Sequence, residues 1–300
     1  MRVFIAGATG YIGGAVAARL LADGHRVSGL ARSEEKAAAL DERGVTPIRA
    51  ELWDLAAVAQ AARDADAVIS AANADDSVVA QLLVDTLRET GKTLIHTSGT
   101  SVAADRALGE PGGKLFTEDT RLAPLPERRL RVEIERIIIG GAALGIRSVV
   151  IRPALIYGRG RGLNPHSHQL PQLLRVARQR GRPAHVGRGL NVWSNVHIDD
   201  VAELYVCALH EAPPGSVFFC ENGEASWRDM TAAIGQSIGL AEEPEPLSLE
   251  ESLRAFGIGA VTSFGSNSRV SAEKARRMLG WKPSAGTIWD DLTSGYYRSL

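Results

Sequence analysis

The sequence has few cysteines, no long apolar run and almost no net charge. Its two cysteines, Cys207 and Cys220, lack the spacing of a metal site, and we expect reduced core thiols in a cytoplasmic protein. No run of about 18 apolar residues occurs, so no membrane span is expected. With 34 basic and 35 acidic residues the formal net charge is −1. This balance argues against nucleic acid or an anionic membrane as a partner.

Short apolar runs alternate with helical patterns over the first half of the chain. A short apolar run that ends at a turn signal is typical of a buried strand. Strict alternation predicts an α/β fold, here a doubly wound parallel (Rossmann) sheet with right-handed crossovers. The expected strands are Arg2–Ala6, Arg26–Ala31, Val45–Ala50, Ala67–Ala72, Thr93–Thr97 and Ser148–Arg152, and the expected helices are Ile12–Asp23, Glu34–Arg43, Leu55–Ala62, Ser77–Thr90 and Glu127–Ala143.

The regular alternation stops after Gly158, which predicts a second, smaller C-terminal domain for the substrate. We expect the sheet domain to comprise residues 1–158 with returning segments near 190–222, and the smaller domain to comprise about 159–189 and 223–300. Ala103–Pro126 is polar and rich in Gly and Pro, so it is expected to be a long loop. The expected later elements are strands Ala184–Arg188 and Val217–Cys220 and helices Leu170–Arg180, Asp199–His210 (capped by an aspartate), Trp227–Ile238, Glu250–Phe256 and Lys274–Leu279.

A glycine-rich turn, Gly7–Gly13, joins the first strand to the first helix. Glycines permit a tight turn and close approach of a pyrophosphate, while the helix N-terminus supplies N–H groups and a positive dipole. This position in the first βαβ unit makes the turn a strong indicator of dinucleotide binding. The turn residues predicted to contact the cofactor are Gly7, Thr9, Gly10, Tyr11, Ile12 and Gly13.

The end of the second strand determines which dinucleotide is expected. An acid there selects NAD through the ribose hydroxyls, whereas an arginine accommodates the 2′-phosphate of NADP. Arg32 and Ser33 follow this strand, and Arg32 lies 19 residues beyond Gly13. No acid occurs after the strand before Glu34. NADP(H) is therefore favoured over NAD(H), with a solvated surface arginine as the alternative interpretation.

Four motifs in order along the chain resemble the extended and atypical short-chain dehydrogenase/reductase families. The first is the GATGYIG turn with Ala71 and Ala72 after the fourth strand, and the second is Ile151–Gly158, similar to an RPxxxYG loop. Val196–Ala202 resembles a VHVDDVA segment, and Leu279–Pro283 resembles an LGWxP ending. The resemblance covers residues 3 to 283 and indicates the superfamily, but no substrate.

The resemblance implies contacts along the whole cofactor. The RPxxxYG loop is expected to lie along the nicotinamide half, and the acid after the third strand near the adenine. For two residues of these motifs a purely structural role is the alternative. Tyr157 would be a packed ring, and His197 would be a hydrogen-bonded link between the domains. The residues that the resemblance adds to the cofactor site are Glu51, Leu52, Ala71, Ala72, Thr97, Ser98, Arg131, Pro153, Ala154 and Ile156.

The tyrosine and lysine that such enzymes use for proton transfer are absent. No tyrosine is followed by a lysine four residues later. In the expected helix, Arg131 and Glu135 best match the family's lysine and following glutamate, which places Glu127 where tyrosine is expected. A second register places Arg129 at the lysine position and Leu125 at the tyrosine position. Arg131 retains donors for the ribose but cannot serve as a proton donor at working pH.

Two hydroxyl groups after the fifth strand, Ser98 and Thr100, are the candidate catalytic groups. Their alternative role is to cap the loop or bind its backbone. Thr100, Asn191, Trp193 and His166 are the candidate substrate contacts, Trp193 either by stacking on a ring or as a core residue. His166 and His168 have no third ligand nearby, so no metal is expected.

The leading interpretation is an NADP(H)-dependent oxidoreductase, an atypical short-chain dehydrogenase/reductase without the catalytic Tyr-Lys pair, acting on a small organic substrate. One alternative is an epimerase, isomerase or lyase that returns its nucleotide unchanged. Another is a non-catalytic NADP(H) sensor that binds a protein partner. The chain is expected to be a monomer or a homodimer, and the charged helix Glu127–Ala143 favours the monomer.

Overall fold

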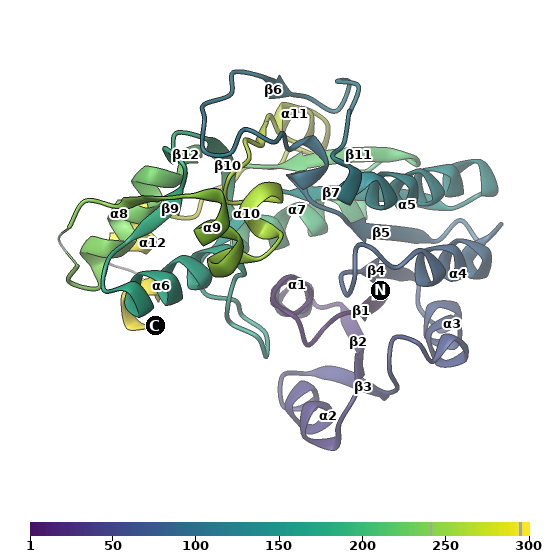
Figure 1. Ribbon diagram of the computed structural model, residues 1–300. Helices are drawn as coiled ribbons and strands as arrows, with labels where there is room; N and C mark the ends of the chain where they lie inside the picture. Colours follow the sequence, from purple (N-terminus) through teal and green to yellow (C-terminus); the bar gives the residue numbers. More distant parts are fainter. Residues whose placement is uncertain (241, 294–295) are drawn as a thin grey trace.

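Seven parallel strands form the central sheet of the protein. The computed structural model describes residues 1–240, 242–293 and 296–300. The strand order is β11-β7-β5-β4-β1-β2-β3 (Figure 1), which confirms the doubly wound parallel sheet. The strands are β1 (Arg2–Ala6), β2 (Arg26–Ala31), β3 (Val45–Arg49), β4 (Ala67–Ser70), β5 (Thr93–Thr97), β7 (Arg147–Pro153) and β11 (Ser216–Cys220).

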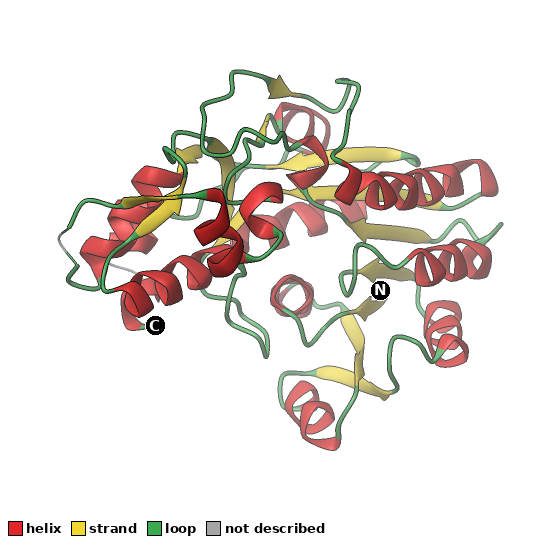
Figure 2. Ribbon diagram, in the orientation of Figure 1, coloured by secondary structure: helices red, strands yellow, loops and turns green. Residues whose placement is uncertain are grey.

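Helices cover both faces of this sheet, so its strands are apolar on both sides (Figure 2). Successive side chains of a strand point to opposite faces. In β1, Val3 and Ile5 enter one hydrophobic core, while Phe4 and Ala6 enter the other. The first core is closed by α1 (Tyr11–Ala22), α2 (Glu34–Asp41), α7 (Ile198–Glu211) and α11 (Glu273–Leu279), and the second by α3 (Leu55–Asp64), α4 (Ser77–Leu87) and α5 (Arg129–Gly140).

A third core, rich in aromatic rings, forms a smaller lobe beside the sheet (Figure 1). Its rings include Trp193, Trp227, Phe256, Phe264 and Tyr297, all at most 8% exposed. Its helices are α6 (Gln169–Arg180), α8 (Trp227–Ser237), α9 (Leu249–Phe256), α10 (Gly259–Thr262) and α12 (Ile288–Thr293), and its strands are β8 (Leu155–Tyr157), β9 (Ala184–Val186), β10 (Val192–His197), β12 (Glu224–Ser226) and β13 (Glu245–Leu247).

Short elements account for most departures from the expected order. The expected loop Ala103–Pro126 contains β6 (Leu115–Phe116), which pairs with β14 (Arg269–Val270). Single helical turns flank other elements: η1 (Thr100–Ala103), η2 (Pro126–Arg128), η3 (Gly141–Leu144) and η4 (Tyr296–Ser299). In the described part of the chain, no helix is long and apolar enough to cross a membrane.

The aspartate cap expected for the helix at Asp199–His210 is wrong. Helix α7 begins at Ile198, and the His197 ring accepts a hydrogen bond from the Asp199 N–H at 3.1 Å. Asp200 instead accepts from the Ser284 N–H at 2.8 Å and from the Ala285 N–H. That carboxylate therefore anchors the C-terminal segment to α7 rather than capping the helix.

Helix α5 is fixed to the sheet by a buried ion pair. Arg152 of β7 donates to both carboxylate oxygens of Glu135, at 2.9 and 2.6 Å. Next to this pair lies His96 of β5, which is 1% exposed and makes no hydrogen bond through either ring nitrogen. Burial lowers the pKa of His96 to about 4, because the charged form loses its hydration.

We expect His96 to make the fold acid-sensitive. A folded pKa below the unfolded value of about 6.5 means that the unfolded chain binds more protons between pH 6.5 and 4, so stability falls as the pH decreases through this window. From pH 7 to pH 5 the loss from this one group is about 2 kcal/mol. Urea unfolding at both pH values should show a smaller loss for His96→Leu, while exposed His210→Gln should behave as wild type. Equal losses in wild type and His96→Leu would contradict this assignment.

Candidate functional site

The loops that carry the predicted cofactor residues meet at one edge of the sheet. Strand pairing aligns Ile5 with Gly29, Ala31 with Arg49, and Ser70 with His96. The carboxyl ends of these parallel strands therefore lie at the same edge, where α/β proteins bind their ligands. Pro153 ends β7, and the predicted residues that come after strand ends are Gly7, Thr9, Arg32, Ser33, Glu51, Leu52, Ala71, Ala72, Ser98 and Ala154.

The glycine turn packs too tightly for side chains. Gly7 has a φ of +102°, and a Cβ atom there would lie 2.6 Å from the Ala71 carbonyl. A Cβ atom on Gly13 would lie 2.2 Å from the Gly7 carbonyl oxygen. Gly7 therefore permits the turn, and Gly13 permits α1 to start directly against it.

The N-terminus of α1 is open toward this edge. Gly10 precedes the helix and no side chain caps it, so the N–H groups of the first turn remain free for an anion. The Tyr11 hydroxyl donates to the Gly158 carbonyl oxygen at 2.7 Å, and burial raises its pKa well above the usual value. Tyr11 therefore ties the loop after β8 to the start of α1. The uncapped N–H groups and the glycine turn fit a dinucleotide pyrophosphate.

The expected adenosine end of the site is more exposed. Arg32 is exposed, and no described residue makes an ion pair or hydrogen bond with its side chain. The Ser33 hydroxyl accepts from the Lys36 N–H at 3.2 Å and so caps α2. Glu34, the first acid after β2, lies 3.5 Å from Arg49 of β3. Glu51 and Leu52 are half-buried in the loop after β3.

A cavity of about 810 Å³, here called the main cavity, lies between this sheet edge and the smaller lobe. It brings together the predicted residues Gly10, Tyr11, Ile12, Ala71, Ala72, Ser98, Thr100, Arg131, Pro153, Ala154, Ile156, His166 and Trp193. The predicted residues Gly7, Thr9, Gly13, Arg32, Ser33, Glu51, Leu52, Thr97 and Asn191 do not line it. Its size is in the usual range for small-molecule sites.

The side chains of three predicted residues form hydrogen bonds within the fold. The Thr97 hydroxyl hydrogen-bonds the Tyr205 hydroxyl at 2.6 Å, on the buried side of β5. Asn191 is fully buried, and its amide donates to the carbonyl oxygens of Phe264 and Ser266. Trp193 lines the main cavity, but it is 3% exposed and its indole N–H donates to the Ser266 carbonyl at 2.8 Å.

Four polar side-chain atoms buried around the main cavity have no partner. They are the hydroxyl oxygens of Ser98, Thr100 and Ser263 and the Nε of Arg128. A buried polar atom without a partner costs about 1–3 kcal/mol, so its presence beside a cavity points to a ligand. Arg128 and Ser263 were not predicted from the sequence; the only signal for Arg128 was its place beside Glu127.

Helix α5 fixes which side chains face this cavity. Arg131 donates to Asp75 through Nε at 2.9 Å and through Nη2 at 2.5 Å, and to the Ser101 hydroxyl at 3.3 Å. The hydrogen bonds from Arg131 lower the pKa of Asp75, partly opposed by burial. The Glu135–Arg152 pair fits the register in which Arg131 occupies the family's lysine position. Glu127, at the tyrosine position, is an exposed residue paired with Arg106 at 2.7 Å and does not line the cavity.

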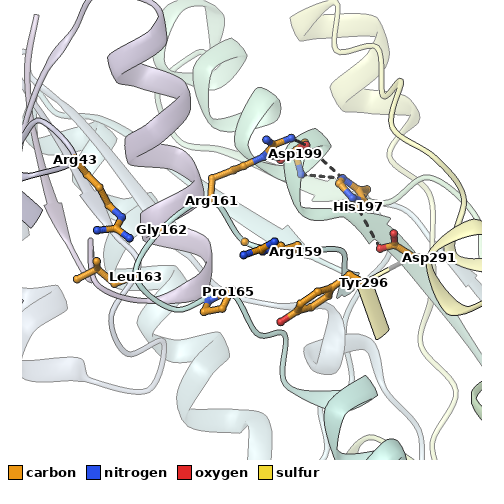
Figure 3. A pocket seen from close by; sticks show the side chains of 11 residues that line it. Arg43, Arg159, Arg161, Gly162, Leu163, Pro165, His197, Asp199, Asp291 and Tyr296 are labelled. Atoms are coloured by element: carbon orange, nitrogen blue, oxygen red, sulfur yellow. Dashed lines mark hydrogen bonds and ion pairs between the residues drawn. The ribbon is translucent and has the colours of Figure 1, made fainter. Parts of the chain in front are cut away.

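A second cavity of about 600 Å³ is lined in part by the loop between Gly158 and His166 (Figure 3). Arg43, Arg159 and Arg161 surround it, and Arg161 is paired with Asp199 at 2.7 Å. Beside it His197 lies 4.0 Å from Asp291. No residue predicted for the cofactor, catalysis or the substrate lines this second cavity, so the main cavity is the candidate active site.

The parallel sheet, the glycine turn and the cleft at its carboxyl edge are those of the short-chain dehydrogenase/reductase fold. The family model described as "NAD dependent epimerase/dehydratase family" matches residues 3–219. The chain belongs to this family.

Relatives of different activity align along nearly the whole chain. A Schizosaccharomyces pombe protein of uncharacterised function is 32% identical over 99% of this chain and all of its own length. The Stigmatella aurantiaca protein named 4-hydroxy-2-methyl-3-oxo-4-farnesyl-3,4-dihydroquinoline-1-oxide ketoreductase is 24% identical, over 94% of this chain and 92% of its own. The structure of UDP-glucuronic acid 4-epimerase from Bacillus cereus with NAD superposes with a TM-score of 0.77 at 18% identity, over 100% and 99% of the two chains. This last similarity shows the fold alone.

The glycine turn makes a direct prediction for cofactor binding. Gly13→Ala would place a methyl group 2.2 Å from the Gly7 carbonyl oxygen, so the turn must shift away from the pyrophosphate. We expect NADPH affinity to fall at least about tenfold, measured by isothermal titration calorimetry. Gly140→Ala is the matched control, because a Cβ atom at Gly140 meets no atom within 4 Å. Unchanged affinity in Gly13→Ala would exclude the turn as the pyrophosphate site.

Proposed function

We propose that the protein is an NADP(H)-dependent oxidoreductase that reduces a carbonyl, imine or activated alkene of a small organic substrate. The observation that carries the proposal is the main cavity, where unpartnered hydroxyls of Ser98 and Thr100 lie beside Pro153 and Ala154, the expected nicotinamide contacts. The family includes a relative named as a ketoreductase. A filled cleft would instead favour a non-catalytic sensor.

The choice of NADP over NAD rests on the charges at the end of β2. Arg32 is exposed with no partner among the described residues, and Lys36 lies one turn further along α2. Glu34, which would oppose a 2′-phosphate, is turned toward Arg49. The unpaired side chain of Arg32 therefore favours an additional phosphate at this point.

The residues of the main cavity would position the reacting groups. When bound, the cofactor supplies a hydride to the electrophilic carbon of the substrate, and the substrate oxygen takes up one proton. The Ser98 and Thr100 hydroxyls would donate to that oxygen and connect it to water, because each has a free donor in a buried position. Arg131, held by Asp75 and Ser101, would orient the nicotinamide ribose.

Ser98 and Thr100 offer little support for an epimerase that must also remove a proton from its substrate. Neither hydroxyl is ionised at working pH, and Glu127 does not line the cavity. The two histidines that do line it, His166 and His168, each hydrogen-bond another side chain through one ring nitrogen, Tyr296 and Gln172 respectively. A reductase requires only that the oxygen be polarised and protonated from water. These groups therefore suit reduction better than reversible oxidation with a retained cofactor.

Arg32 should determine the cofactor preference. Arg32→Ala removes a charge-assisted contact worth about 1.5–3 kcal/mol, so the Kd for NADPH should rise about 10- to 100-fold while the Kd for NADH changes little. Arg26→Ala is the matched control, since Arg26 is exposed at the opposite end of the same strand. Calorimetric titration with both nucleotides checks this. Equal NADPH and NADH affinity in the wild type would reject NADP specificity.

The two cavity hydroxyls should matter for turnover rather than for nucleotide binding. We expect Ser98→Ala and Thr100→Val each to lower kcat by about 10- to 100-fold and the double variant by more, since loss of one oxyanion donor costs up to about 10²–10³. The Kd for NADPH should stay within about twofold. The loss of NADPH absorbance with a panel of ketones, imines and enones provides the measurement. Full turnover in the double variant would show that the proton reaches the substrate by another route.

A further inference from the structure

One cation in the main cavity is not neutralised by the described protein residues. Arg128 is half-buried at the end of η2, and no described carboxylate lies within ion-pair distance of it. Its Nη2 donates to the Thr262 hydroxyl at 3.2 Å, and its Nη1 makes a long contact of 3.4 Å to the Glu127 carbonyl oxygen. Its Nε is buried without a partner. Much of the donor capacity of this guanidinium is therefore unused.

The carboxylates nearest in sequence and space are already engaged. Asp75 accepts both of its charge-assisted bonds from Arg131, and Glu127 is paired with Arg106. Burial, and then the charge of Arg131, lower the pKa of Arg128. Because Arg131 and Arg106 each have their own anion, Arg128 is left as an uncompensated positive charge that lines the cavity. An anionic ligand would relieve both the charge and the missing hydrogen bonds.

A second unpartnered donor lines the same cavity from the smaller lobe, one residue after the Thr262 that Arg128 contacts. Ser263 follows Thr262 directly, lines the main cavity, and has a buried hydroxyl without a partner. Arg128 comes from the sheet side and Ser263 from the lobe side, so a group between them would bridge the two halves of the cleft. This position is on the lobe side of the cavity, away from the glycine turn.

The wall around this corner of the cavity is apolar. Phe256 and Phe264 stack with ring centroids 4.2 Å apart, and both line the cavity together with Trp193 and Ile258. Aromatic rings of this kind accept an apolar or aromatic ligand body. A single positive charge matches a carboxylate better than a phosphate dianion, and a guanidinium matches the planar carboxylate geometry.

We propose that Arg128, together with Ser263, binds the carboxylate of an apolar or aromatic oxo acid and thereby sets the substrate class of the enzyme. This inference rests on the proposed oxidoreductase function for the identity of the reacting group. The charged end of the substrate lies between Arg128 and Ser263, and its body lies against the phenylalanine pair. Its carbonyl then extends toward Ser98 and Thr100.

Binding without turnover tests this inference separately from the reaction. Phenylglyoxylate, 3-benzoylpropionate and 4-benzoylbutyrate, each with its methyl ester, are titrated into the full chain by calorimetry with and without NADP⁺. We expect at least one acid to bind about tenfold or more tightly than its ester. Arg128→Met should abolish that preference, and Arg128→Lys should retain part of it. Arg129→Met, an exposed neighbour outside the cavity, should leave it unchanged.

Each outcome decides for or against the carboxylate site. No preference for any acid over its ester in the wild type overturns it, as does an undiminished preference in Arg128→Met. A parallel loss of NADPH affinity in Arg128→Met also overturns it, because Arg128 would then be a cofactor ligand. Thermal melting shows whether a variant is folded, and the acid–ester comparison in the wild type needs no variant. A clear preference with no NADPH oxidation would leave this site standing and reject the reductase alone.

Discussion

The buried ion pair between Glu135 and Arg152 is the constraint on which the geometry of the cleft depends. Its two hydrogen bonds join α5 to β7 in a region from which water is excluded, where removal of one partner would leave an isolated charge costing several kcal/mol. Helix α5 therefore has one rotational setting against the sheet. Arg131 lies one helical turn before Glu135, so this setting directs it into the main cavity. Arg128, three residues earlier in the chain, lines the same cavity.

This setting explains how a chain without the family's tyrosine keeps an organised cleft. Arg131, which the resemblance matches to the family's lysine, donates to Asp75 and Ser101. Glu127, which the same register matches to the tyrosine, pairs with Arg106 outside the cavity. Besides two histidines that hydrogen-bond within the fold, His166 to Tyr296 and His168 to Gln172, the polar groups that line the cavity include the hydroxyls and Arg128, which can hold and polarise a substrate. The chain thus keeps the glycine turn and the cleft of its family without a tyrosine–lysine pair.

Much of the sheet and its carboxyl edge could be predicted from the sequence, because both depend on local signals. Buried parallel strands are apolar throughout, and the close approach of Gly13 to Gly7 requires glycine at fixed spacing. The smaller lobe was harder, since β8, β12 and α10 have only three or four residues each and owe their form to tertiary packing. Arg128 and Ser263 were missed because nothing in the sequence shows that residues 135 positions apart line one cavity.

The unpartnered atoms around the cleft also limit the stability of the protein without ligand. Ser98, Thr100, Arg128 and Ser263 each forgo a hydrogen bond that an apolar side chain of similar size would not need. A fold selected for stability alone would satisfy or remove these groups, whereas a site for a polar ligand must keep them in place. Their arrangement around one cavity, with the Arg128 guanidinium and an aromatic wall on one side and the Ser98 and Thr100 hydroxyls on the other, therefore favours a ligand that is polar at both ends and apolar between them.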